Sequence, residues 1–329
     1  MEVKAWEYDE YPGLTEEVEG AVHIPTTGDE PGVYHWHDIP YAEVDGHTLV
    51  LQILEPYTRN EPEKLHPCFV FVQGSAWGVQ DVYKSCPHYA RLAARGYVVA
   101  VVQYRHSGIA HFPAPIQDAR NAVRFMRLHA ADYHLDGENF FLGGCSSGGH
   151  TAVFAALADQ EPWLDASVYP GVSADVMGIL DYYGAVSMTE MDDFPDTLEH
   201  HLETSPEGME MGVNLREHPE LAARATAVTY IRPETKLPPV WIMHGTKDRK
   251  VSPYQSVRLY KKLKECGKEA TLYLVDGADH GGSEFWTPEA VDAADRFMKE
   301  IIQRHKNQKS YNHFGSPLRT ASDVPLGSC

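Results

Sequence analysis

The stretch that organises this chain is residues 139–157, which read NFFLGGCSSGGHTAVFAAL. A short apolar run is followed by a cluster of glycines and an alanine-rich run, an order that predicts a buried strand, a tight turn and a helix. The turn contains Gly144-Cys145-Ser146-Ser147-Gly148, which fits the pattern G-x-S-x-G. Such a turn strains its central serine and presents the hydroxyl above the sheet, so the flanking positions need glycine, which lacks a Cβ atom. We therefore predict that Ser146 is a nucleophile.

Composition and charge exclude several classes of protein. The chain has 329 residues, of which 43% are hydrophobic, and no apolar run approaches the ~20 residues of a membrane span. Its net charge of −19 argues against binding to nucleic acid or to anionic membranes, because phosphate contacts need clustered Lys and Arg. The first residues lack the basic and apolar regions of a signal peptide, and the five cysteines show no C-x-x-C spacing. We expect a cytoplasmic protein with reduced thiols.

Strands and helices alternate along most of the chain. Apolar runs at 68–72, 97–102, 139–142, 176–180, 239–243 and 271–275 predict strands, and residues 88–95, 116–131, 256–266 and 288–304 predict helices. Continuous apolar strands between helices indicate a parallel sheet that is covered on both faces. Before them, Asp45-Gly46 lies between β-rich flanks and predicts an antiparallel hairpin at the edge of this sheet. The fold class is therefore α/β.

Domain boundaries follow from where this alternation breaks. We expect an irregular N-terminal arm over residues 1–32, a single catalytic domain over 33–306, and an irregular or disordered tail over 307–329. Residues 188–231 are too long for an ordinary connection between two strands, so they predict a small helical, lid-like insertion. Because this segment emerges at the carboxyl edge of the sheet, we expect it to cover part of a pocket and to limit the size of the substrate.

A serine nucleophile needs an imidazole to accept its proton and a carboxylate to fix the imidazole tautomer. Two strand ends downstream of Ser146 supply candidates: Asp248 follows the strand at 239–243, and His280 follows the strand at 271–275. Their chain order is the one associated with a G-x-S-x-G turn. Asp276 is an alternative acid, and Cys145 is a weaker alternative nucleophile.

The developing oxyanion needs backbone N–H donors. One is expected at Ser147, the first residue of the helix, and a second from the loop after the strand at 68–72. That loop reads Gln73-Gly74-Ser75-Ala76-Trp77, and the small side chains of Ser75 and Ala76 let their amides approach a substrate oxygen.

These motifs together resemble the α/β-hydrolase superfamily, in the carboxylesterase branch related to hormone-sensitive lipase and to bacterial acetyl and feruloyl esterases. The resemblance covers roughly residues 65–305 and rests on residues 73–77, Tyr104-Arg105, residues 112–114, Asp118, residues 144–150, residues 244–248 and His280-Gly281. Two positions depart from the branch pattern. The oxyanion loop keeps one of three glycines, and Cys145 stands where the branch often has an acidic residue.

The resemblance implies a serine carboxylesterase that acts through an acyl-enzyme on short-chain or hydroxycinnamoyl esters, without a cofactor. The expected partner is a small ester, such as a plant phenolic or an acylated carbohydrate, and homo-oligomer formation stays open. Trp77 and Trp286 are candidates to line the substrate pocket, Arg105 and Asp118 to brace the loops around it. An amidase of the same fold, such as an arylformamidase, and a non-catalytic binding protein are the alternatives. The paired histidines at 35/37 and 200/201 lack confirming ligands, so no metal site is predicted.

Overall fold

One mixed sheet forms the centre of the molecule in the computed structural model, which describes residues 3–57, 60–195 and 197–314. Its strand order is β1-β2-β4-β3-β5-β6-β7-β8. The strands are β1 (Gly32–Val44), β2 (His47–Tyr57), β3 (His66–Val72), β4 (Val98–Val102), β5 (Leu135–Cys145), β6 (Gly178–Tyr182), β7 (Val240–Gly245) and β8 (Ala270–Val275). The pairs β1·β2 and β2·β4 are antiparallel, and all neighbours from β4 to β8 are parallel. The α/β fold class predicted from the sequence is confirmed.

The predicted hairpin joins β1 to β2 through Asp45 and Gly46, which have φ angles of 52° and 78°. Positive φ at both central residues is what a two-residue hairpin turn requires for its twist to match that of the strands. Tyr41 anchors the hairpin to the next strand, because its hydroxyl donates to the carbonyl of Gln103 at 2.7 Å.

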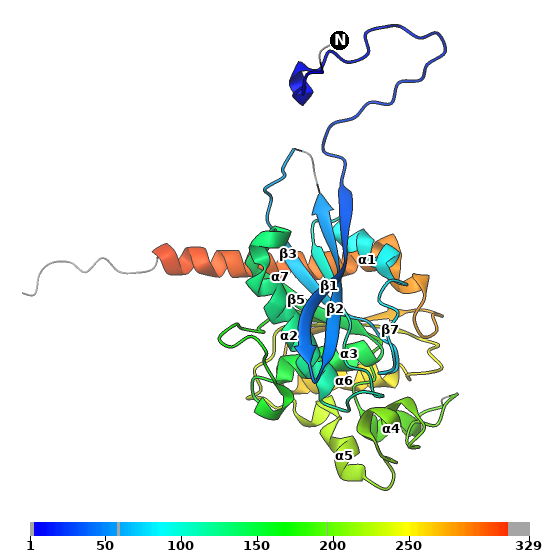
Figure 1. Ribbon diagram of the computed structural model, residues 1–329. Helices are drawn as coiled ribbons and strands as arrows, with labels where there is room; N and C mark the ends of the chain where they lie inside the picture. The colour runs from blue at the N-terminus through cyan, green and yellow to red at the C-terminus, as the bar shows by residue number, and fades with distance from the viewer. Residues whose placement is uncertain (1–2, 58–59, 196, 315–329) are drawn as a thin grey trace, which may run out of the picture.

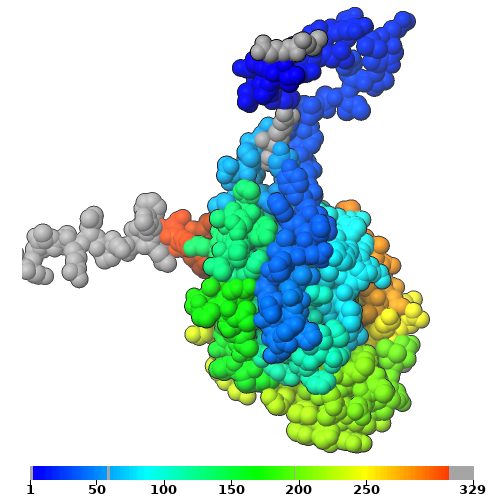
Figure 2. All heavy atoms as spheres, viewed as in Figure 1, coloured from blue at the N-terminus to red at the C-terminus, as the bar shows by residue number. Residues whose placement is uncertain are grey.

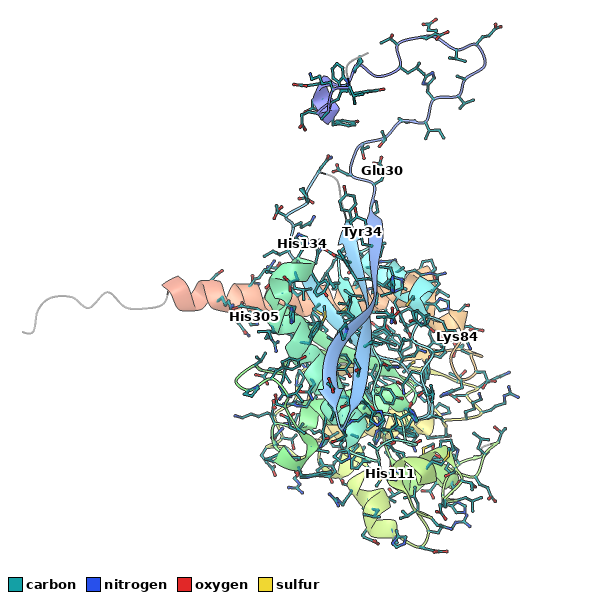
Figure 3. All side chains as sticks on the ribbon, in the orientation of Figure 1. Glu30, Tyr34, Lys84, His111, His134 and His305 are labelled. Carbon is teal, nitrogen blue, oxygen red and sulfur yellow. The ribbon has the colours of Figure 1, made fainter. Side chains whose placement is uncertain are left out.

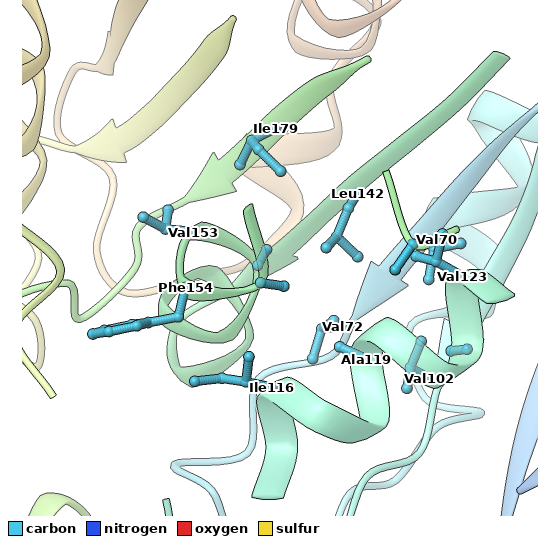
Figure 4. Packing of buried hydrophobic residues seen from close by; sticks show 14 of the residues in the cluster. Val70, Val72, Val102, Ile116, Ala119, Val123, Leu142, Val153, Phe154 and Ile179 are labelled. Atoms are coloured by element: carbon cyan, nitrogen blue, oxygen red, sulfur yellow. The ribbon is translucent and has the colours of Figure 1, made fainter. Parts of the chain in front are cut away.

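Helices cover both faces of the sheet (Figure 1). They are α1 (Cys86–Ala93), α2 (Ala114–Leu128), α3 (Ser147–Leu157), α6 (Tyr254–Glu265) and α7 (Pro288–Phe314). In β3 the side chains alternate, so that Val70 packs with α2, α3 and α6 while Phe69 and Phe71 pack with α1 and α7. Figure 4 shows the first of these two cores, in which Ile116 of α2 and Phe154 of α3 belong to the same cluster as Val70 of β3. Burial on both faces is why the central strands read as continuous apolar runs.

The N-terminal arm is irregular in the described residues. Between residues 3 and 31 the only regular element described is a short 3₁₀ turn at Tyr8–Glu10, and every residue but Gly28 is exposed. Figure 2 shows this segment standing clear of the body of the molecule.

The tail differs from the prediction. Helix α7 continues to Phe314, past the predicted boundary at residue 306, and Figure 1 shows its end projecting from the body. Residues 307–310 are exposed and polar, so no apolar face signals a helix there, and continuation of the preceding helical turns decides their conformation. The rest of the predicted tail, residues 315–329, lies outside the described residues. No helix in the described ranges is both long and apolar enough to cross a membrane.

The predicted insertion is helical. It contains short 3₁₀ helices at Met188–Asp193 and Ala227–Thr229, and the helices α4 (Pro206–Met211) and α5 (Pro219–Arg224). Ser205 caps α4, because its side chain accepts a hydrogen bond from the amide of Gly208 at 3.0 Å. Such a cap replaces an intrahelical partner that the first turn lacks.

Candidate active site

The turn between β5 and α3 places Ser146 at φ 55° and ψ −124°, a backbone conformation that side chains rarely adopt. The neighbouring glycines are required by close packing. A Cβ atom on Gly144 would lie 2.3 Å from the carbonyl oxygen of Gly148, and one on Gly148 would lie 2.0 Å from that of Val72. The predicted strand, strained turn and helix are all present, and they lift the Ser146 side chain above the carboxyl edge of the sheet.

Ser146, His280 and Asp248 form one hydrogen-bonded chain. His280 Nε2 lies 2.9 Å from Ser146 Oγ, and His280 Nδ1 lies 2.7 Å from Asp248 Oδ2. An ionised carboxylate only accepts hydrogen bonds, so Nδ1 carries the proton and Nε2 is left to accept from the serine hydroxyl. The structure thus brings the three predicted residues together in the order and geometry that general-base activation of a serine needs.

The carboxylate of Asp248 is held by more partners than its sequence context indicates. The amides of Lys250 and Val251 donate to Oδ1, both at 2.9 Å, and His244 Nε2 lies 3.1 Å from Oδ2. Burial alone raises the pKa of a carboxyl, but the hydrogen bonds from His244 and His280 outweigh it and hold the pKa of Asp248 well below its usual range. Asp248 is therefore ionised at neutral pH.

His244 is a supporting residue that the sequence analysis did not single out. Its ring is fully buried, and Nε2 donates to the carbonyl of Val251 at 2.9 Å while Nδ1 lies 2.6 Å from Ser256 Oγ. The sequence feature that could have indicated this role is its position as the penultimate residue of β7, the strand that leads to Asp248. This imidazole fixes the loop that carries the acid.

Both alternatives for the catalytic residues are disfavoured. Asp276 is exposed, and the carboxylate against His280 is that of Asp248. Burial raises the pKa of the Cys145 thiol, so the reactive thiolate is scarce at neutral pH. Cys145 instead accepts a hydrogen bond from the Gly74 amide at 3.2 Å. A sulfur thus supports the oxyanion loop at the position where the resembling branch often has a carboxylate.

The oxyanion loop differs from the prediction at one amide. The Ser75 N–H donates to Ser147 Oγ at 3.0 Å, so it holds the loop against α3 and is not free for a substrate oxygen. No local pattern predicts this bond, because the two residues are 72 positions apart in the chain. The two remaining predicted donors are the amides of Ala76 and Ser147. Ala76 lines the catalytic cavity, and Ser147 begins α3, where an amide has no intrahelical acceptor.

The oxyanion loop is strained, and the side chain of Tyr104 holds it in place. Ala76 and Trp77 have φ angles of 53° and 55°, a region that is costly for residues other than glycine. Tyr104, which is 1% exposed, places its hydroxyl 2.8 Å from Ser75 Oγ and 3.3 Å from Ser147 Oγ. One phenol therefore ties the oxyanion loop to the first residue of α3.

Loss of this phenol is expected to slow catalysis without weakening substrate binding. Tyr104→Phe should lower kcat about fivefold with little change in KM. One hydrogen bond is worth about 1 kcal/mol, which corresponds to about that factor, and this one positions groups that contact the transition state. Steady-state kinetics on a neutral ester measures both constants. Tyr97→Phe is the matched control, since Tyr97 is also buried but its hydroxyl bonds Asp295, 2.8 Å away. A wild-type kcat in Tyr104→Phe would contradict the bracing role.

Ser146 and His280 open into a cavity of about 550 Å³. Its walls come from the oxyanion loop, the start of α1, and the loops that carry His280 and Lys250. The lining residues are Gln73, Gly74, Ser75, Ala76, Lys84, Ser85, His88, Tyr89, Cys145, Ser146, Tyr183, Lys250, His280, Gly281, Gly282 and Trp286. The Tyr183 ring packs edge-on to His280, with the ring centroids 5.0 Å apart.

The two predicted pocket tryptophans have different positions. Trp286 lines the cavity and is stacked between Tyr182 and His88, with centroids 5.2 and 6.0 Å away and interplanar angles of 14°. Trp77 is not a lining residue, which corrects the prediction. It is 2% exposed and packs edge-on against His150 in a small core beneath the insertion. The positive φ at Trp77 turns the chain, and the apolar residues of the insertion then bury the indole.

The insertion also lies elsewhere than predicted. Within the described residues, none from 188 to 231 lines the cavity around Ser146. Met188, Met191 and Leu215 pack against Trp77, Ala185 and Val251. His150 Nε2 donates to the carbonyl of Ala225 at 3.0 Å, which ties the first turn of α3 to the insertion. The position of the insertion is thus decided by burial of its apolar side chains against Trp77, Ala185 and Val251.

The other residues singled out in the sequence have structural partners. Arg105 Nε donates to both oxygens of the buried Asp118, at 3.1 and 3.0 Å, and so forms the predicted brace. His200 pairs with Glu207, and His201 pairs with Asp192. In the part of the chain that the structure describes, no group of three or more His, Cys, Asp or Glu side chains is arranged to hold a metal ion.

A mostly parallel sheet with a serine on the strand-to-helix turn, followed by an acid and a histidine at later strand ends, defines an α/β-hydrolase. Residues 51–263 match the family model BD-FAE, and the chain belongs to this family.

Comparison with known proteins agrees with this assignment. The chain is 26% identical over 239 residues to the esterase LipQ of Mycobacterium tuberculosis (strain ATCC 25618 / H37Rv), covering 72% of this chain and 54% of that protein. It is 27% identical to the esterase LipC of the same organism, covering 70% of this chain and 57% of LipC. The chain thus spans about half the length of these relatives. A solved structure described as a truncated carbohydrate esterase from gut microbiota superposes with a TM-score of 0.71 at 24% identity, covering 84% of this chain and 98% of that chain, and shows the same fold.

Proposed function

We propose that this chain is a serine carboxylesterase that hydrolyses short-chain or hydroxycinnamoyl esters through an acyl-enzyme. The observation that carries the proposal is the unbroken chain from Ser146 Oγ through His280 to Asp248, with bonds of 2.9 and 2.7 Å, at the edge of a cavity. Family membership and the similarity to proteins named esterases support the same class of reaction.

The proposed reaction has two halves. Ser146 Oγ attacks the ester carbonyl carbon while His280 Nε2 takes the hydroxyl proton, and the amides of Ala76 and Ser147 stabilise the oxyanion. The proton passes from His280 to the departing alcohol, and the acyl group stays on Ser146. Water then attacks the acyl-enzyme with His280 as base, which releases the carboxylic acid and restores the serine hydroxyl. The ionised Asp248 stabilises the charged imidazole in both halves.

Two measurements together test this function. A serine-directed phosphonate should label Ser146, and a panel of acetyl, butyryl, octanoyl and feruloyl esters should be hydrolysed at rates that depend on Ser146. An anilide panel run beside it tests the amidase alternative. Labelling without hydrolysis of any ester in the panel would reject the proposed substrate class, and the absence of both would reject the serine mechanism.

The cavity wall is expected to limit the acyl chain. Trp286 and Tyr89 are buried, packed edge-on 5.1 Å apart, and leave a space of about 550 Å³. Each methylene that fits adds ~0.8 kcal/mol, close to fourfold in specificity, so kcat/KM should rise from acetyl to butyryl and then drop at least about tenfold by octanoyl.

Two tryptophan variants test whether the cavity wall or the insertion limits the length of the acyl chain. Trp286→Leu should move the maximum of the 4-nitrophenyl ester profile toward longer chains, while Trp77→Phe should leave the position of the maximum unchanged because Trp77 lies outside the cavity. Circular dichroism and thermal melting check that each variant is folded. A wild-type rate that climbs steadily through decanoyl esters would contradict the limit.

A further inference from the structure

We propose that the preferred substrate of this site is an ester carrying a second, anionic group, and that Lys84 and Lys250 bind this group at the mouth of the cavity. The inference rests on the proposed esterase function and names its substrate class. It starts from a contrast in charge. The chain has 47 acidic and 28 Lys and Arg residues, yet the described lining of the cavity contains two lysines and no Asp or Glu.

The two lysines reach one cavity from separate parts of the fold. Lys84 lies just before α1, and Lys250 lies two residues after Asp248 in the loop that follows β7. Figure 3 marks Lys84 on the flank of the body away from the projecting end of α7. Both lysines are exposed, so their ammonium groups are hydrated and can reach a ligand in solution.

Neither ammonium group has an ion-pair partner among the described residues, whereas Arg249, the neighbour of Lys250, pairs with Asp279. The nearby carboxylates are oriented toward other groups. Asp81 Oδ1 accepts the backbone amide of Lys84 at 3.2 Å, and Asp248 Oδ1 accepts that of Lys250. Glu284 does not line the cavity, although one of its carboxylate oxygens would lie 2.3 Å from a Cβ atom built on the lining residue Gly282. Two unpaired cations thus remain available to a ligand.

The wall next to Lys84 fits a flat organic acid. His88, one helical turn further on, stacks on Trp286, and its Nδ1 atom is buried without a hydrogen-bond partner in the described structure. The His88 ring is the most exposed member of this stack, and it lines the same cavity as Lys84. A carboxylate on a ring or a short chain would pair with the cation while its carbon frame packs against the His88 ring.

An overall acidic protein repels anions at a distance, so cations placed at the cavity have a selective effect. They raise the local concentration of anionic esters and lower KM for them relative to neutral esters of the same shape. Because both lysines are exposed, the gain is modest for each and weakens as salt screens it.

The test compares matched pairs of esters. On the alcohol side, 4-carboxyphenyl acetate is compared with its methyl ester; on the acyl side, 4-nitrophenyl hemiadipate is compared with 4-nitrophenyl methyl adipate. The readout is the ratio of kcat/KM for the anionic to the neutral member, measured at low and at physiological ionic strength. Comparing this ratio between variants cancels the intrinsic reactivity of each ester.

Lys84→Gln and Lys250→Gln are each expected to lower the ratio about two- to fivefold for at least one pair of esters. The double variant should lower it by the product of the two single fold-changes. The salt dependence of the ratio should shrink in parallel. Lys264→Gln, an exposed lysine on α6 outside the cavity, is the matched control and should leave the ratio unchanged. Which pair responds tells whether the anion is on the acyl or the alcohol side.

The proposal is overturned if the double variant keeps the wild-type ratio for both pairs, or if Lys264→Gln lowers it equally. Failure of the esterase function looks different, because the neutral esters would then show no hydrolysis that depends on Ser146.

Discussion

Replacement of Ser146 by alanine is expected to lower kcat for ester hydrolysis by about 10⁴- to 10⁶-fold and to abolish labelling by a serine-directed phosphonate. The hydroxyl oxygen of Ser146 is the atom that forms the acyl bond. Its proton is the one that His280 Nε2, 2.9 Å away, removes, so alanine leaves the imidazole without a nucleophile to activate. Substrate binding should persist, because the cavity wall is unchanged. Alanine also fits the strained turn no worse than serine, so the variant should fold.

The matched control for this variant is Cys145→Ala, one residue earlier. Its thiol supports the Gly74 amide but does not contact Ser146, so we expect a loss of less than about tenfold and undiminished labelling. Full labelling of Ser146→Ala, or loss of labelling in Cys145→Ala, would show that the thiol is the nucleophile. Intact-protein mass spectrometry after phosphonate treatment distinguishes the two results.

Asp248→Asn is expected to lower kcat by about 10⁴-fold near neutral pH, the size of the effect seen when an asparagine replaces the acid of a serine protease. The hydrogen bonds of this site dictate how the asparagine must sit. Two backbone amides donate to Oδ1, so the amide oxygen stays there and the NH₂ group takes the Oδ2 position. It then faces His280 Nδ1 and donates to it, which moves the ring proton to Nε2, where it can no longer accept from Ser146.

Asp276→Asn is the control, because this carboxylate is exposed and Asp248 is the acid that contacts His280. Its kcat should stay within about threefold of the wild type, since an exposed charge that does not contact the catalytic histidine has a small effect. Larger damage from Asp276→Asn than from Asp248→Asn would mean that the acid is misassigned. His244 also lies against the Asp248 side chain, so thermal melting of Asp248→Asn is needed to separate a chemical loss from a disturbed loop.

Some features of the site could be predicted because they are local. The sharp turn needs glycine at fixed offsets from Ser146, because a Cβ atom on Gly144 would lie 2.3 Å from the carbonyl oxygen of Gly148, and one on Gly148 would lie 2.0 Å from that of Val72 on a neighbouring strand. A requirement at fixed offsets leaves a pattern in the sequence. Asp248 and His280 could be proposed as the acid and the base because each follows a strand, and parallel strands bring their carboxyl ends to one edge of the sheet. Side-chain alternation in β3 likewise follows from the two-residue period of a strand.

What the sequence by itself determined, therefore, is the order of the elements, the strand, turn and helix around Ser146, the hairpin at Asp45-Gly46 and the choice of Ser146, Asp248 and His280 as the proposed catalytic residues. Only the tertiary structure decided which side chains meet across long separations. The Ser75 amide bonds Ser147, and Tyr104 joins these two residues. Trp77 is buried under the insertion, whereas Trp286 lines the cavity together with two lysines from separate parts of the chain. The physical reason is that backbone conformation is set by neighbours in the chain, whereas burial and pairing of a side chain depend on which surfaces dock. That choice is made by the total apolar area and the hydrogen bonds of the whole fold, and it leaves no periodic trace in any one segment.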